Sequence, residues 1–170
     1  MRVNRMAAAV YMTCLGNLFM LSGEEFARTK YGLENSYNAS IEINRLDWQR
    51  AYDNFELMEY YRGLICLRKM LPGLCDKRPY AWKRIEEEWK TNGAVGFMVD
   101  NHSEEKESRW GTLYIIYNSS KDVTEVELPK GQWEVLLDGH SSFLWEDPVI
   151  AGNTVKVERQ SVLIFGKTGK

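Results

Sequence analysis

The feature that most constrains the fold is the short run Leu18-Phe19-Met20-Leu21. It follows Val3–Leu15, an Ala- and Met-rich segment that predicts a helix with Gly16 as its C-terminal cap. A four-residue run that is apolar at every position is typical of a strand in a parallel sheet covered on both faces. Parallel strands are joined through crossover helices, and the sequence offers no second strand–helix–strand unit. We therefore expect Leu18–Leu21 to be one strand of a barrel whose other strands are missing from this chain.

The next part of the chain predicts a loop and then helices. Phe26–Trp48 is polar, aromatic and irregular, which is typical of a long loop. A long helix is expected from about Gln49 to Leu71, ended by Pro72-Gly73, because apolar residues recur at three-and-four spacing; its stripe contains Leu57, Met58, Tyr61, Leu64, Ile65 and Arg68. Tyr80–Lys90 predicts a short helix whose three successive glutamates form a solvated face.

After Asn92-Gly93 the pattern changes to short strands separated by turns, which indicates an antiparallel β-sandwich. The expected strands are Ala94–Val99, Thr112–Tyr117, Val123–Leu128, Trp133–Leu137, Thr154–Val157 and Ser161–Phe165. With a boundary near Thr91, residues 1–90 form the first domain and residues 91–170 the second. The expected fold class is therefore an α+β composite.

Composition excludes several classes of protein. A formal net charge of −2 over 170 residues argues against nucleic acid or an anionic membrane as the main partner, because both require a basic surface. The three cysteines, Cys14, Cys66 and Cys75, show neither metal-ligand nor redox spacing and weakly favour a reducing, cytoplasmic compartment. A secreted parent protein is the alternative, because a basic start and an apolar run superficially match a signal peptide with cleavage near Ala27.

The usual catalytic motifs do not occur in the sequence. There is no nucleophile elbow, phosphate-binding loop or dinucleotide fingerprint, and neither His102 nor His140 has a neighbouring metal-ligating partner. The stretch from Ser22 to Trp48 is different, because it follows the end of the expected strand, where barrel enzymes build their active sites. Its polar and aromatic side chains suit sugar hydroxyls and sugar ring faces, or they stabilise the loop through internal ion pairs.

Residues 16–70 resemble the last barrel strand, the following loop and the eighth barrel helix of type I pullulanases, the α-1,6-glucan debranching enzymes of the α-amylase superfamily. The resemblance rests on Phe19–Lys30, Glu34–Asn38, Asn44–Trp48 and Tyr60–Lys69, and the chain departs from the family's more usual Ile-Pro pair at Asn17-Leu18. It implies a fold made of the last helix–strand–helix part of a (β/α)8 barrel followed by a C-terminal antiparallel β-sandwich. Beyond Gly93 the resemblance is architectural.

The resemblance also implies what the chain does. The family's three catalytic acids precede the matched region, so no catalytic residue maps here, and the chain is expected to be a C-terminal fragment that is inactive alone. Its parent enzyme would cleave branch linkages in pullulan, glycogen or starch, without a cofactor or a metal in this part. The expected partners are an α-glucan and the missing N-terminal barrel portion. The residues that carry over bind substrate or hold the loop in shape: Arg28, Lys30, Asn35, Ser36, Tyr37 and Asn44.

Two further expectations remain open. The sandwich could instead be a carbohydrate-binding module that stacks sugars on Trp110, Trp133, Tyr114 or Trp145. In addition, an unpaired apolar strand is a template for pairing with another chain. We therefore expect copies of this chain to associate through Leu18–Leu21.

Overall fold

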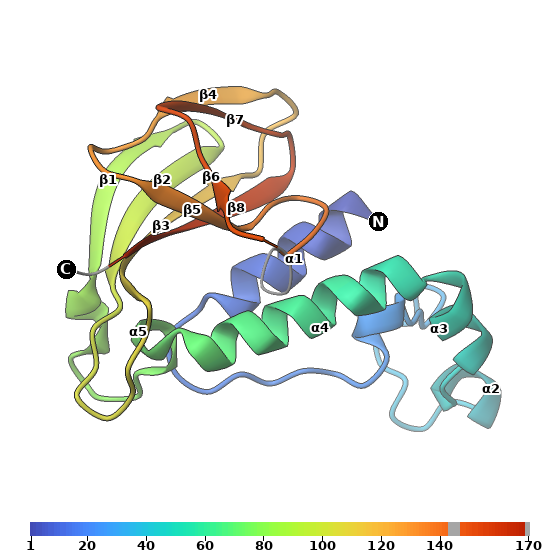
Figure 1. Cartoon of the computed structure of the whole chain (residues 1–170). Helices are drawn as coiled ribbons and strands as arrows, with labels where there is room; N and C mark the ends of the chain where they lie inside the picture. Colours follow the sequence, from blue (N-terminus) through green and yellow to red (C-terminus); the bar gives the residue numbers. More distant parts are fainter. Residues whose placement is uncertain (143–146, 169–170) are drawn as a thin grey trace.

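A computed structural model describes residues 1–142 and 147–168. The chain forms an antiparallel β domain with helices along one side (Figure 1). The helices are α1 (Arg2–Met12), α2 (Ile41–Asn44), α3 (Trp48–Asp53), α4 (Phe55–Met70) and α5 (Pro72–Cys75), with two 3-10 turns, η1 (Glu24–Phe26) and η2 (Ala81–Arg84). The strands are β1 (Ile85–Thr91), β2 (Ala94–Asp100), β3 (Trp110–Asn118), β4 (Thr124–Glu127), β5 (Trp133–Leu137), β6 (Val149–Ile150), β7 (Thr154–Val157) and β8 (Ser161–Thr168).

The strands form two sheets. Six strands pair in the order β1-β2-β3-β8-β5-β6, and β4 pairs with β7 in a second, two-stranded sheet. Every ladder between these strands is antiparallel. The expected antiparallel β region is confirmed, and the bounds of β5 and β7 are those that the sequence predicts.

The central strands β3 and β8 of the six-stranded sheet are buried on both faces, which explains their continuous apolar texture. In β3, Leu113 and Ile115 belong to the core shared with α1 and α4, whereas Tyr114 and Ile116 belong to the core shared with β4 and β7. The strand β4 is different, because it is covered on one face only: Val126 is buried, and the glutamates on either side of it are exposed. This is the alternation that the sequence predicts for residues 123–128.

The predicted helix over Tyr80–Lys90 is wrong after its first turn. Residues 85–91 form β1, an edge strand that pairs with β2. Glu, Lys and Trp tolerate a helix, but pairing with β2 and a hydrogen bond of 2.6 Å from Trp89 Nε1 to Tyr114 Oη override that local preference. The close approach of Trp89 also requires Gly96, since a Cβ there would lie 2.4 Å from the indole nitrogen. The three glutamates are exposed, as expected, but they lie on a strand.

The helical side of the molecule is held to the sheet by α1, which lies between α4 and the sheet (Figure 1). Ala8, Ala9 and Met12 of α1 are buried in the same core as Leu64 and Leu67 of α4. Two polar contacts add to this packing: Thr13 Oγ1 lies 2.5 Å from Tyr117 Oη, and Tyr60 Oη donates to the Asp138 carbonyl at 2.9 Å. The expected long helix from Gln49 to Leu71 is divided at Asn54 into α3 and α4.

Candidate functional site

The segment Leu18–Leu21 enters the candidate site in an extended form, but it is not a strand. Among residues 1–142 and 147–168 it has no ladder partner, so the predicted barrel strand is not seen in the described chain. A strand requires a neighbouring backbone to accept and donate its hydrogen bonds. Leu18 and Met20 pack against the helical core, whereas Phe19 is 90% exposed and Leu21 is 46% exposed. One side of this segment is therefore covered and the other side is bare.

A tight turn follows and fixes the direction of the loop. Gly23 has a φ of +98°, and a Cβ there would lie 2.8 Å from the Arg28 side chain. The Gly23 N–H donates to Glu25 Oε2 at 2.9 Å. Phe26 is buried, and its ring centroid lies 5.7 Å from that of Trp48, at the far end of the loop. Both ends of the loop are thus joined through one aromatic contact.

Four of the six predicted site residues meet around Asn44. Lys30 Nζ donates to Asn44 Oδ1 at 2.5 Å, and Asn44 Nδ2 donates to the carbonyl of Ser36 at 2.8 Å. The Arg28 guanidinium donates to the carbonyls of Asn44 and Ser22. Desolvation first, and the charge of Arg28 second, lower the pKa of the Lys30 ammonium. These hydrogen bonds connect the first half of the loop to Asn44, near its end.

The other two predicted residues lie outside that network. Asn35 Oδ1 accepts a hydrogen bond of 3.2 Å from the backbone N–H of Tyr37, which shapes a local turn. The Tyr37 side chain is 88% exposed, and Asn35 is exposed as well. Their side chains are exposed to a ligand, whereas those of Arg28, Lys30 and Asn44 already form hydrogen bonds within the loop.

Three residues that the sequence analysis did not assign to the loop also position it. Arg50 donates through Nε and Nη2 to the Ala27 carbonyl, at 3.0 and 2.5 Å, and Asn54 Nδ2 donates to the Phe26 carbonyl at 3.4 Å. Arg68 donates to three carbonyls that precede the Leu18–Leu21 segment. Arg68 could have been singled out from the sequence, because it is a charged residue on the predicted apolar stripe of the long helix.

Glu24 and Glu25 affect the tyrosines beneath the turn. Burial raises the pKa of Tyr61 to about 12, and the negative charge of Glu24 adds to this effect. Burial, followed by the charges of Glu24 and Glu25, also raises the pKa of Tyr11. These phenols therefore remain neutral at physiological pH and serve as packing groups with polar ends.

The sandwich aromatics expected to stack sugars are core residues. Trp110, Trp133 and Tyr114 are each at most 4% exposed, so their ring faces cannot meet a ligand at the surface. The prediction is wrong for these three because strand aromatics here fill the two layers on either side of the central sheet. Trp145 lies outside the described residues.

In the two described ranges, no group of three or more His, Cys, Asp and Glu side chains could hold a metal ion. None of the helices in these ranges has the length and apolar character needed to cross a bilayer.

The helices, the polar loop and the sheet together are similar to a part of known pullulanases. Residues 88–141 match the family described as the all-beta domain of pullulanase. The resemblance to pullulanases expected from residues 16–70 is therefore confirmed.

Pullulanases of Bacillus subtilis and Paenibacillus barengoltzii are among the proteins that this chain is similar to. The chain is 36% identical over 162 residues to the pullulanase of Bacillus subtilis (strain 168), a match that covers 95% of this chain and 22% of the relative. Type I pullulanase from Bacillus subtilis, solved in complex with maltose, superposes with a TM-score of 0.86 at 30% identity, covering 99% of this chain and 24% of that one. Apo pullulanase from Paenibacillus barengoltzii gives a TM-score of 0.83 at 32% identity, with coverage of 99% and 25%. The chain thus spans about a quarter of the length of the relatives it matches.

Proposed function

We propose that this chain is the C-terminal part of a pullulanase-like glycoside hydrolase that cleaves α-1,6 branch linkages in pullulan, glycogen or starch. Residues 1–90 would complete a (β/α)8 catalytic barrel with its last strand, a substrate-side loop and the last helix. Residues 91–170 would form the β-sandwich that braces this barrel. The catalytic acids would be supplied by the preceding barrel strands, so the chain alone would have no hydrolase activity.

The observation that carries this proposal is the one-sided burial of Leu18–Leu21. A barrel strand directs alternate side chains outward to the helices and inward to the barrel interior. Leu18 and Met20 pack on the helical core, and Phe19 and Leu21 are exposed. Completely burying a large apolar side chain stabilises a protein by about 1.5–3 kcal/mol, so bare side chains at alternate positions favour a covering structure.

The loop geometry divides the six candidate substrate residues into two groups. Arg28, Lys30, Ser36 and Asn44 would be positioning residues, because their polar groups or carbonyls close the loop. Asn35 and Tyr37 would contact the glucan, Tyr37 through the apolar face of its exposed ring. The maltose complex of the Bacillus subtilis relative supports an α-glucan as the ligand class.

A chimera tests the proposal directly. The matching portion of the Bacillus subtilis pullulanase is replaced by this chain, and release of reducing ends from pullulan is measured. We expect the chimera to cleave pullulan, and both this chain alone and the relative lacking that portion to remain at the buffer blank. In the chimera, Tyr37→Ala should raise KM more than it lowers kcat, whereas Glu34→Ala, an exposed neighbour, should leave both unchanged. Turnover by the isolated chain, or a folded chimera without activity, would contradict the assignment.

A further inference from the structure

An exposed aromatic pair lies away from the loop, at the start of η2. Tyr80 and Trp82 are 68% and 65% exposed, and Ala81 between them is buried. The Lys83 ammonium lies 5.0 Å from the centroid of the Tyr80 ring and 5.9 Å from that of Trp82. Two large rings beside one cation thus face solvent, where they contribute little to the core.

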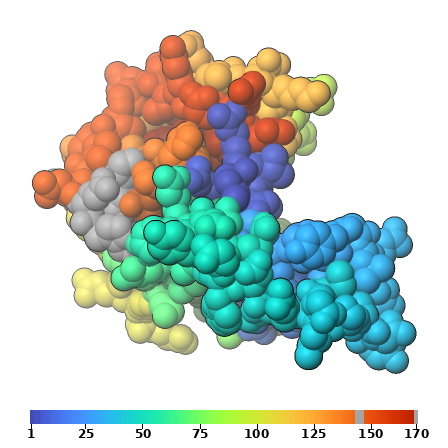
Figure 2. Space-filling view, turned by 90° about the vertical axis from the view of Figure 1, so that its right-hand side faces the viewer, coloured from blue at the N-terminus to red at the C-terminus, as the bar shows by residue number. Residues whose placement is uncertain are grey.

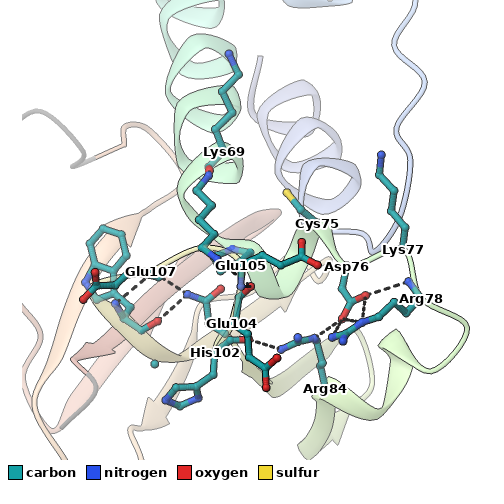
Figure 3. A pocket seen from close by; sticks show the side chains of 17 residues that line it. Lys69, Cys75, Asp76, Lys77, Arg78, Arg84, His102, Glu104, Glu105 and Glu107 are labelled. Atoms are coloured by element: carbon teal, nitrogen blue, oxygen red, sulfur yellow. Dashed lines mark hydrogen bonds and ion pairs between the residues drawn. The ribbon is translucent and has the colours of Figure 1, made fainter.

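The turn that carries this pair is firmly anchored. Asp76, which is buried, accepts hydrogen bonds of 2.6 Å from Arg84 Nε and from Arg78 Nη2 (Figure 3). Arg84 Nη1 also donates to the carbonyls of Asp100 and His102, both at 2.9 Å. These contacts fix the backbone on both sides of Tyr80 and Trp82, so the rings are presented from a rigid support.

A polar hollow of about 880 Å³ adjoins the turn. Lys77 and Arg78, which precede the aromatic pair, and Arg84, which follows it, all line the hollow (Figure 3). Its lining includes five cationic and four acidic side chains, namely Lys69, Lys77, Arg78, Arg84 and Lys106 with Asp76, Glu104, Glu105 and Glu107. This near balance of charge favours neither an anion nor a cation. Asp76 and Arg84 are occupied by the contacts above, and the exposed side chains that remain, among them Lys77, Glu104 and Glu105, provide donors and acceptors for a neutral ligand with many hydroxyls.

We propose that Tyr80, Trp82 and the adjoining hollow form a carbohydrate-binding platform for an α-glucan chain, separate from the substrate-side loop. The rings would stack on apolar sugar faces, and Lys83 with the hollow's side chains would bind hydroxyls. The choice of α-glucan as the sugar rests on the proposed function.

Affinity electrophoresis of the full 170-residue chain in gels containing pullulan or amylopectin tests this platform. We expect retardation relative to a gel without polysaccharide. Tyr80→Ala and Trp82→Ala should each weaken binding about threefold to tenfold, the double variant should migrate as in the plain gel, and Trp82→Phe should retain most of the retardation. The matched control is Tyr52→Ala, which removes a still more exposed ring (82%) on α3 and should migrate like the unaltered chain.

The outcomes separate this platform from the catalytic assignment. Both rings are mostly exposed, so their alanine variants should keep the unfolding midpoint of the unaltered chain. If such a folded variant binds polysaccharide as tightly as the unaltered chain, the proposed platform is wrong. Unaltered mobility of the chain in both polysaccharide gels overturns it as well. An inactive chimera together with retardation that depends on Tyr80 and Trp82 would refute the catalytic proposal and support the platform.

Discussion

Replacing Arg68 with alanine should destabilise the fold by about 3 kcal/mol, because one guanidinium holds three backbone carbonyls at the end of α1. Arg68 Nη1 donates to Met12 O and Cys14 O, and Nη2 donates to Gly16 O, each at 2.7 Å. The last carbonyls of a helix have no partner within the helix. Met12 is buried, so losing its partner costs about 1–3 kcal/mol, while water can replace the other two bonds at about 0.5 kcal/mol each.

Urea unfolding followed by circular dichroism measures this loss through the linear dependence of the unfolding free energy on denaturant. Arg68→Lys should recover only part of it, since an ammonium cannot span three acceptors as a planar guanidinium does. Arg62→Ala is the matched control on the same helix: its side chain is 71% exposed and, among the residues described, forms an ion pair with Glu59 alone, so its effect should stay below about 0.5 kcal/mol. An Arg68→Ala variant no less stable than Arg62→Ala would refute the assigned role of these three bonds.

Four further outcomes follow from the contacts described. Hydrogen bonds, first from the Arg78 side chain and then from its backbone and Arg84, hold the pKa of Asp76 well below its ordinary 3.8. Asp76→Asn should therefore lower the free energy of unfolding at pH 7. The difference in urea midpoint between this variant and the unaltered chain should narrow as the pH falls toward the folded-state pKa of Asp76. Asn44→Ala should speed amide hydrogen exchange across residues 28–44 while leaving that of β3 unchanged, and equal exchange in the loop would show that Asn44 does not hold it. Light scattering at high concentration should detect self-association that Phe19→Asp abolishes, whereas a monomeric unaltered chain would contradict pairing through Leu18–Leu21. Thermal unfolding followed by near- and far-ultraviolet circular dichroism should give one coincident transition, because α1 and α4 share a core with the central sheet, and two separated transitions would support independent folding of residues 1–90 and 91–170.

The β region could be predicted from sequence because its signals are local. Alternation around Val126 and turn residues between the strands locate most of the elements within a few residues. The edge strand β1 was missed, since its pairing with β2 is what stabilises it over a helix. Burial of β3 on both faces also depends on two partners, the helices and the second sheet, which come from opposite ends of the chain.

The candidate loop was predictable in content but not in arrangement. The sequence identifies a polar and aromatic stretch after an apolar segment, but Asn44 meets Lys30 across 14 residues and Arg28 across 16 residues of irregular chain. No periodicity encodes such contacts. The exposed pair at the start of η2 was missed for the opposite reason, because a helix was assigned to Tyr80–Lys90 and its aromatic residues then had no distinct role.

Large exposed hydrophobic side chains are unevenly distributed over the surface of this molecule. Large exposed hydrophobic side chains gather on the helical part, among them Phe19, Leu33, Ile41, Trp48 and Phe55. The loop and α2–α3 that carry several of them stand out as a lobe at one side (Figure 2). The central strands β3 and β8 of the sheet, in contrast, have both faces covered by their own chain. Exposed apolar area of this kind marks interaction surfaces, so the barrel that we propose would stand on the side of Leu18–Leu21 and the loop.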